Sequence, residues 1–176
     1  MKIGIVISTT REGRVGLEVG TWFLDKTSND ENTYEIVDIR DYNLPFLGTS
    51  EDNTAVIKWN QKLLELDGFI FITAEYNHSI SGALKNALDS ARDSWYNKAA
   101  GIVSYGSAGG ARAAEHLRGI LSELKIASVR SHILLSLFDD FEQFTKFKPR
   151  EIHNKNISVM LQEVNDWANA LRPLRK

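Results

Sequence analysis

The stretch FITAEYNHSISGALKNALDSARD, Phe71–Asp93, begins as a strand and ends as a helix. Its first residues belong to the apolar run Gly68–Thr73, and in its second half Leu84, Leu88 and Ala91 recur at intervals of four and three. Continuous apolar runs suit strands that are covered on both faces, and this spacing suits a helix packed along one side. The stretch therefore predicts a buried strand followed by a helix, the repeating unit of a parallel α/β fold.

The same alternation recurs along the whole chain. Further apolar runs predict strands over Ile3–Ile7, Tyr34–Ile39, Ala99–Val103 and Ser128–Leu137. Helical spacing predicts helices over Leu17–Lys26, Ala55–Leu66, Ala113–Leu124 and Ile157–Leu171. Since no repeat, low-complexity tract or proline-rich linker divides the chain, we expect a single domain, residues 1–176, with a doubly wound five-stranded parallel sheet.

Residues 138–156 interrupt this alternation. Phe138, Phe141, Phe144 and Phe147 recur every three residues, which predicts one apolar stripe on a helical turn. The stripe either packs on the domain's own core, or forms a subunit contact or a lid over a ligand.

Composition restricts the function. Among 176 residues, 21 Lys and Arg face 23 Asp and Glu, a net charge of −2, which argues against general binding to nucleic acid or to a membrane surface. The absence of cysteine excludes a thiol nucleophile, a disulfide framework and an iron–sulfur cluster, and the four histidines show no metal-binding spacing. From these residues we expect no metal site. The apolar start of the sequence is too short for a signal peptide, so we expect a cytoplasmic protein.

Three polar loops follow the first, third and fourth predicted strands, whose carboxyl ends meet at the edge where open α/β sheets bind ligands. The first loop, Ser8–Gly16, reads STTREGRVG and precedes a helix. Hydroxyls, guanidinium groups and the unpaired N–H groups of a helix start together suit a phosphate monoester. Alternatively, Ser8 or Thr9 only caps the helix and the arginines are solvated.

The middle loop, Glu75–Ser79, places a carboxylate, a phenol, a carboxamide and an imidazole in a row. Such a mixture suits a flat heteroaromatic ring with polar edges. The alternative is that Asn77 shapes the turn, Ser79 or Ser81 caps the next helix, and His78 is exposed. The last loop, Ser104–Arg112, is rich in glycine, and it either gathers backbone N–H groups around an oxygen or is only a turn.

The segments STTREGRVG, AEYNHSISGALKNALD and SYGSAGGARAAEHLRGILSELK resemble the NADPH-dependent FMN reductases, a flavodoxin-like family that includes quinone, azo-dye and chromate reductases. The resemblance spans about residues 2–135. It implies a flavodoxin-like fold and three sets of FMN-binding residues. For the phosphate it implies Thr9, Arg11, Arg14, Val15 and Gly16; along the isoalloxazine ring Glu75, Tyr76, Asn77 and His78; and at its pyrimidine edge Ser104, Gly106, Ser107, Gly109 and Gly110.

The resulting hypothesis is an NAD(P)H-dependent flavin oxidoreductase. FMN would accept hydride at N5 from NADPH or NADH and reduce a second acceptor such as a quinone, free flavin or azo compound, so no side chain need be catalytic. The last loop contains no acid, and a helix start there would stabilise an anionic flavin edge by about 0.3–2 kcal/mol. The residues do not choose between NADPH and NADH.

Two other functions share this fold. One is an FMN-binding electron carrier of the flavodoxin type, without NAD(P)H turnover. The other is a phospho-acceptor regulator, which is disfavoured because Ser8–Thr10 and Thr73–Ala74 stand where it needs acids. The resemblance further implies a homodimer or homotetramer with FMN near the subunit interface. In that case Trp95 and Tyr96 either face the neighbouring subunit's flavin or close the core.

Overall fold

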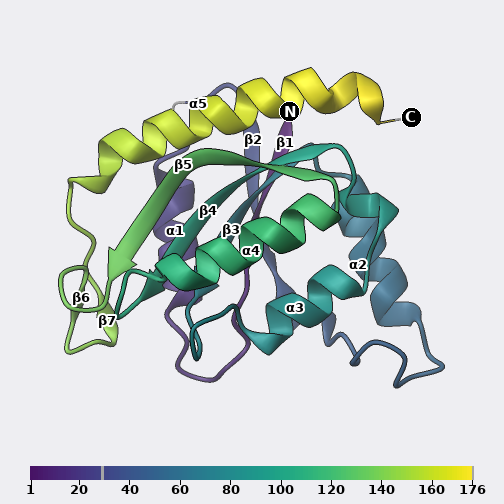
Figure 1. Cartoon of the computed structure of the whole chain (residues 1–176), viewed down its shortest axis with the longest axis horizontal. Coiled ribbons are helices and arrows are strands. Elements are labelled where there is room, and N and C mark those ends of the chain that lie inside the picture. Colours follow the sequence, from purple (N-terminus) through teal and green to yellow (C-terminus); the bar gives the residue numbers. More distant parts are fainter. Residues whose placement is uncertain (29, 176) are drawn as a thin grey trace.

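The central sheet has five parallel strands in the order β2-β1-β3-β4-β5, drawn in Figure 1. The computed structural model describes residues 1–28 and 30–175. Its strands are β1 (Lys2–Ile7), β2 (Thr33–Asp38), β3 (Gly68–Ala74), β4 (Lys98–Gly106) and β5 (Ile126–Ser136), with a small hairpin of β6 (Phe141–Glu142) and β7 (Lys146–Phe147). The α-helices are α1 (Gly16–Asp25), α2 (Thr54–Leu64), α3 (Gly82–Asp89), α4 (Ala111–Glu123) and α5 (His153–Leu171), and the 3₁₀ turns are η1 (Ile39–Tyr42), η2 (Asp93–Trp95) and η3 (Arg172–Leu174).

The predicted doubly wound sheet is confirmed, with each of its strands placed within three residues of the expected bounds. Strands β3 and β4 are buried along their whole length, which is why their sequences are apolar without alternation. The chain crosses outward from β1 to β2 and then returns past β1 to β3. The point where strand order reverses therefore lies between β1 and β3.

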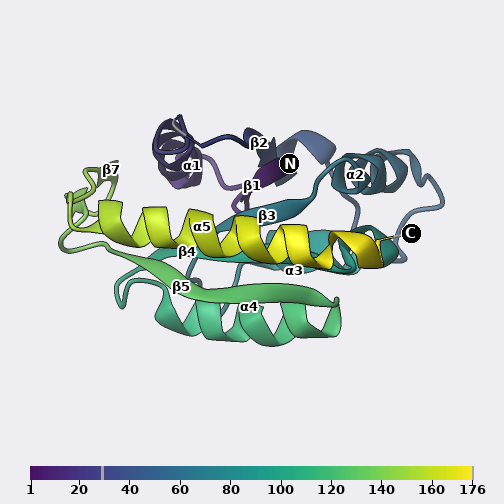
Figure 2. The ribbon, with the colours of Figure 1, turned by 90° about the horizontal axis from the view of Figure 1, so that it is seen from above.

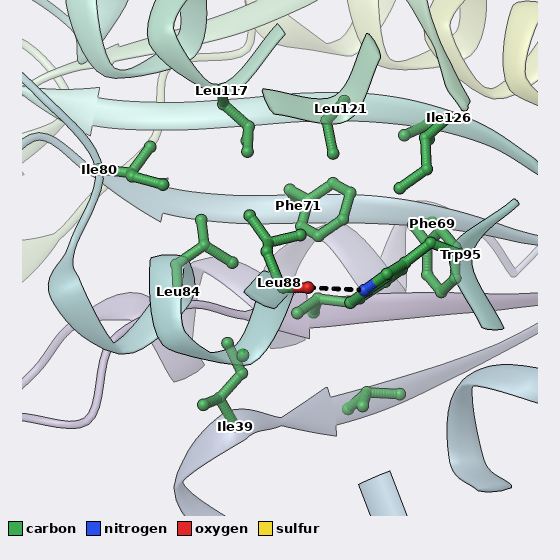
Figure 3. Packing of buried hydrophobic residues seen from close by; sticks show 14 of the residues in the cluster. Ile39, Phe69, Phe71, Ile80, Leu84, Leu88, Trp95, Leu117, Leu121 and Ile126 are labelled. Carbon is green, nitrogen blue, oxygen red and sulfur yellow. Dashed lines mark hydrogen bonds between the residues drawn. The ribbon is translucent and has the colours of Figure 1, made fainter. Parts of the chain in front are cut away.

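One face of the sheet is covered by α2, α3 and α4, and its core is aromatic. Phe69, Phe71, Trp59 and Trp95 are buried together there, with the Phe69 and Trp95 rings 4.9 Å apart. Figure 3 shows Phe69, Phe71 and Trp95 in this core. The Trp95 indole donates to the Leu88 carbonyl at 3.2 Å, the dashed line in Figure 3. Of the two alternatives for Trp95, the structure shows that this residue closes the core of its own chain.

The opposite face is covered by α1 and α5, and Figure 2 shows α5 and α4 on opposite sides of β5. Close packing of α5 depends on Gly101 in β4, because a Cβ at that position would lie 2.7 Å from the Met160 sulfur. Helix α5 begins at His153, four residues before the predicted start. In the part of the chain that the structure describes, no helix is long and apolar enough to cross a membrane.

The predicted helical stripe over 138–147 is wrong, because this segment forms the β6–β7 hairpin. Phe141 and Phe147 point inward, with ring centroids 5.2 Å apart, while Phe138 and Phe144 are exposed and pack on each other at 5.4 Å. Phe141 and Phe147 face each other across the hairpin, Phe144 lies in its turn and Phe138 precedes it. The period of three therefore imitates a helical period without forming a helix.

A buried carboxylate, that of Asp140, holds this hairpin segment in place. It accepts hydrogen bonds from the Ser136 amide at 2.9 Å, from the Arg150 Nε at 3.0 Å and from His153 Nε2 at 2.8 Å. Burial alone would raise the pKa of Asp140, but the bonds from Arg150 and its neighbours outweigh burial and hold the pKa below its ordinary value. The carboxylate is therefore a charged anchor between β5 and α5.

Candidate functional site

The three loops singled out in the sequence meet at the carboxyl edge of β1, β3 and β4. The Ser8 amide donates to the Ile72 carbonyl at 3.1 Å, and the Glu75 amide donates to the Tyr105 carbonyl at 2.9 Å. The Ser81 hydroxyl donates to the Ser8 carbonyl at 2.7 Å. These bonds join the first loop to β3 and α3, and the middle loop to the end of β4.

The first loop buries two hydroxyl groups that lack an internal partner. Within the described residues, Ser8 Oγ and Thr9 Oγ1 are buried without a hydrogen bond of ordinary geometry, and the polar group beside Thr9 is the Tyr105 hydroxyl. Leaving such groups unsatisfied costs about 1–3 kcal/mol each, so they fit a ligand that supplies oxygen atoms. The loop leads into α1, whose N-cap residue Val15 contributes no side-chain cap in the described structure. The first N–H groups of α1 therefore have no side-chain acceptor at that residue.

Close approach at this point depends on Gly16, the first residue of α1. A Cβ on Gly16 would lie 2.6 Å from Thr9 Oγ1 and 3.0 Å from the Tyr105 hydroxyl. Tyr105, at the end of β4, is buried, and burial raises its pKa to about 12. Helix α1, the first loop and β4 are thus packed against one another around the Thr9 hydroxyl.

The two arginines of the first loop have different surroundings. Arg14 pairs with both oxygens of Asp38 and donates to the Thr9 carbonyl, and the side chains of Arg14 and Asp38 are only 9% and 8% exposed. The hydrogen bond to Asp38 raises the pKa of Arg14. Arg14 therefore fixes the first loop to the end of β2, and its contact with a phosphate stays a prediction.

Arg11, in contrast, is exposed and makes no ion pair within the described residues. The Arg11 guanidinium donates a hydrogen bond to the Tyr76 hydroxyl of the middle loop, which raises the pKa of Arg11. Since the side chain carries no carboxylate partner there, its charge is available to an anion at the first loop.

The middle loop is a two-residue hairpin turn. The Tyr76 amide donates to the Ser79 carbonyl at 2.9 Å and the Ser79 amide donates to the Tyr76 carbonyl at 3.1 Å, while Asn77 and His78 have φ of 47° and 74°. This is the geometry of a type I′ turn, for which Asn is well suited. The expectation that Asn77 shapes the turn is confirmed, and His78 is exposed, with its ring 5.8 Å from that of His116.

The helix after this turn is capped by Ser81, whose hydroxyl accepts from the Leu84 amide at 3.1 Å. Of the two predicted caps, Ser81 is therefore the one used. Its hydroxyl serves both α3 and the Ser8 carbonyl. The same side chain thus sets the position of α3 relative to the first loop.

Glu75 does not point freely into the site. Its carboxylate, 4% exposed, pairs with the Arg112 guanidinium and accepts from the Arg112 amide at 3.2 Å, at the start of α4. Burial opposes ionisation of Glu75, but Arg112 holds its pKa below the ordinary value. The last loop itself has no acid, yet Glu75 brings a carboxylate to its helix start. Because Arg112 pairs with this carboxylate, the pair carries no net charge, and the stabilisation of an anionic flavin edge by this terminus stays a prediction.

The last loop follows a backbone path that requires glycine. Gly109 and Gly110 have φ of 66° and 74°, and a Cβ on Gly110 would lie 2.7 Å from the Ser104 Cβ and from the Tyr105 nitrogen. The Ser104 hydroxyl donates to the Gly109 carbonyl at 2.8 Å and lies 2.9 Å from His132 Nε2. Because Ser104 donates to Gly109, His132 Nε2 is the donor to Ser104. Burial lowers the pKa of His132 to about 4, which keeps the ring neutral.

The structure thus brings together the three loops and their fourteen predicted site residues at one edge, with Ser107 exposed on the last loop. Sequence reasoning missed Tyr105 and the anchoring residues Asp38 and Arg112. Tyr105 was signalled only by its position between Ser104 and Gly106 at a strand end. The pairings of Asp38 and Arg112 join distant segments and leave no local pattern.

Two cavities flank this architecture. One, of about 470 Å³, adjoins the first loop at Thr10 and is lined by the segment after β2 and by the start of α3. The other, of about 430 Å³, lies at the opposite, amino edge of the sheet, around Lys98 and Arg175. Of these two, the first cavity lies beside the first loop, which it meets at Thr10.

Comparison with known proteins agrees with this geometry. The family model for NADPH-dependent FMN reductases matches residues 1–140. The chain belongs to the NADPH-dependent FMN reductase family. An NAD(P)H-dependent FMN reductase of Schizosaccharomyces pombe is 31% identical over 167 residues, which cover 82% of each chain. A 2-hydroxy-1,4-benzoquinone reductase of a Burkholderia species is 31% identical over 134 residues, which cover 72% of this chain and 73% of the relative.

Solved structures support the flavodoxin-like fold. The flavoenzyme NAD(P)H:acceptor oxidoreductase of Paracoccus denitrificans superposes with a TM-score of 0.77 at 17% identity, covering 96% of this chain and 97% of its own. A flavodoxin of Streptococcus pneumoniae superposes with a TM-score of 0.61 at 12% identity, covering 94% and 99%. Within the NADPH-dependent FMN reductase family the cofactors are FMN and NAD(P)H, so an NAD(P)H-dependent flavin oxidoreductase is favoured over a carrier without turnover.

Proposed function

We propose that this NAD(P)H-dependent flavin oxidoreductase binds FMN across its three loops and passes electrons to a small acceptor such as a quinone, a free flavin or an azo compound. The observation that supports the proposal most is the first loop, where two buried hydroxyls without partners stand before an uncapped helix start. That donor set fits a phosphate monoester. FMN, when bound, supplies the hydride-accepting chemistry between NAD(P)H and the acceptor.

The chain's own residues then bind and orient the cofactor. Thr9, Arg11, Val15 and Gly16 hold the phosphate, and Arg14 positions the loop through Asp38 and the Thr9 carbonyl. Tyr76, Asn77 and His78 line the ring, while Glu75 fixes the last loop through Arg112. Ser104, Gly106, Ser107, Gly109 and Gly110 offer backbone and hydroxyl donors to the pyrimidine edge. No side chain acts as nucleophile, and no metal is involved.

Residues 1–176 act as one domain, and the protein is a homodimer or homotetramer in the cytoplasm. The electron acceptor enters the site from solvent. The exposed Phe138–Phe144 pair supports a subunit contact beside the site. Light scattering at micromolar concentration should give a mass above 19.8 kDa. A mass of 19.8 kDa alone would remove the subunit contact but not the FMN site.

The test of the FMN site uses Thr9→Val, which removes one buried hydroxyl at nearly constant volume. Hydrogen bonds to a charged group contribute about 1.5–3 kcal/mol, so FMN affinity should fall about 10- to 150-fold. Thr27→Val is the matched control, because Thr27 is a buried threonine at the other end of α1 that donates to the Leu24 carbonyl. Equal FMN affinity in wild type and Thr9→Val, measured by flavin fluorescence titration, would contradict the phosphate assignment.

Activity is tested by following NADPH absorbance with benzoquinone as acceptor. The FMN-loaded wild type should oxidise NADPH steadily, with turnover that requires FMN. A protein that binds FMN but shows no acceptor-dependent NADPH or NADH oxidation would instead be an electron carrier.

A further inference from the structure

The cavity of about 470 Å³ beside the first loop has the dimensions and the chemistry of a ligand site. Small-molecule sites commonly enclose about 300–1,000 Å³. Its walls come from three places in the sequence: Thr10 of the first loop, Arg40 and Asn43 in and after η1, Phe46 beyond them, and Gly82 and Asn86 of α3. Because Thr10 follows Thr9 directly, the cavity lies next to the loop that holds the FMN phosphate in the proposed function.

The wall that carries Phe46 is fixed in place by a side chain of α3. The Asn86 carboxamide donates to the Pro45 carbonyl at 2.9 Å and accepts from the Leu47 amide at 3.1 Å. These bonds hold the segment around Phe46 on α3, although the Phe46 ring itself is 72% exposed. An exposed aromatic ring on an anchored backbone at a cavity wall is suited to stacking on a flat heterocycle.

The charge at the cavity comes from Arg40. Its side chain is exposed and makes no ion pair with any residue in 1–28 or 30–175. Its amide donates to Asp38 at 3.0 Å, and that carboxylate is already paired with Arg14. The backbone of Arg40 is thus anchored while its guanidinium remains available, a combination that suits a phosphate group.

We propose that this cavity receives the adenosine end of NADPH, with Phe46 against the adenine and Arg40 on the 2′-phosphate. The assignment rests on the proposed function, which requires a dinucleotide donor beside FMN. Besides FMN, which the three loops bind in the proposed function, NADPH is the reactant that combines a planar base with a phosphate monoester, whereas a quinone or an azo compound carries no phosphate for Arg40 to bind. Arg40 would then select NADPH over NADH, the choice that the sequence left open.

The test compares both coenzymes on the FMN-loaded protein with one quinone as acceptor. Arg40→Gln should raise KM for NADPH about 10- to 100-fold, leave KM for NADH within about twofold and leave kcat unchanged. Phe46→Ala should raise KM for both coenzymes. Arg92→Gln, an exposed arginine outside the cavity lining, is the matched control and should change neither.

A binding measurement separates this inference from the proposed function. Adenosine 2′,5′-bisphosphate should bind wild type in calorimetry and bind Arg40→Gln at least tenfold more weakly, even if no coenzyme oxidation were found. Equal binding by the two proteins, or an equal rise in KM for NADPH and NADH in Arg40→Gln, would overturn the assignment. Loss of the oligomer in Phe46→Ala, with unchanged KM values, would also overturn it and make the Phe46 wall a subunit contact.

Discussion

Replacing Arg14 by methionine removes one partner of an almost fully buried ion pair. The Asp38 carboxylate, 8% exposed, would keep only the Arg40 amide as a donor, since both of its oxygens are paired with Arg14. Breaking such a pair from one side costs about 3–5 kcal/mol, because an uncompensated charge stays buried, whereas an exposed pair is worth about 0–1 kcal/mol. We expect the larger range here, since neither side chain can rehydrate without moving the first loop.

The measurement is urea unfolding followed by tryptophan fluorescence, which reports on the buried Trp59 and Trp95. With an m-value of about 2 kcal/mol/M, a loss of about 3–5 kcal/mol lowers the midpoint by about 1.5–2.5 M. Lys85→Met is the matched control, because Lys85 pairs with Asp89 on the surface of α3, with side chains 50% and 37% exposed. Its midpoint should move by less than about 0.5 M.

A second variant separates the charge from the packing. Arg14→Met combined with Asp38→Leu removes both charges, and a buried pair can often be replaced by apolar residues at little cost. The double variant should therefore be more stable than Arg14→Met alone. The reasoning is refuted if Arg14→Met moves the midpoint no more than Lys85→Met does, or if the double variant is the least stable of the set.

Three further substitutions test the site and its supports. Gly110→Ala should destabilise the protein by about 2 kcal/mol or more in thermal unfolding. The new Cβ would lie 2.7 Å from the backbone of β4, and residue 110 has a φ of 74°. As a control, Gly119→Ala changes an open position in α4 and should stabilise the protein by about 0.5–1 kcal/mol. The pKa of His132, about 4 when folded and near 6.5 when unfolded, means that the unfolded chain takes up the proton first as pH falls. Stability should therefore drop between pH 6.5 and 4 by about 2–3 kcal/mol, and His132→Gln should flatten that decline. Asp140→Asn should increase amide hydrogen exchange across residues 137–152 and leave β1 and β3 protected. An unchanged exchange pattern would show that Asp140 does not anchor this segment.

The sheet could be predicted from the sequence because burial on both faces leaves a direct record. Strand β3, Gly68–Ala74, is apolar at nearly every position, and no helical period fits it. The sequence of the hairpin at 138–147, in contrast, predicted the wrong structure, a helical turn. Gln143 and Phe144 in its turn have φ of 51° and 61°. Glycine or asparagine at these positions would have predicted a turn, whereas glutamine and phenylalanine do not.

For the site, the sequence located the loops but not the roles of the charged residues within them. The type and position of Arg14 predict a phosphate ligand but do not predict its pairing with Asp38, which lies 24 residues away at the end of another strand. Glu75 similarly pairs with Arg112, 37 residues away. Such pairings depend on which strand ends are neighbours, and local pattern does not contain that information. By contrast, the cap of Ser81 on α3 is local and was predicted.

The placement of β1 in the sheet has a consequence for biosynthesis. This strand leaves the ribosome before the other strands of the sheet, but one of its two neighbours is β3, which is more than sixty residues further along the chain. Until β3 emerges, β1 can pair only with β2, and an apolar strand then has one edge open to other nascent chains. The N-terminal third of the chain should therefore aggregate when expressed alone, and folding should wait for synthesis of the β3–β4 half.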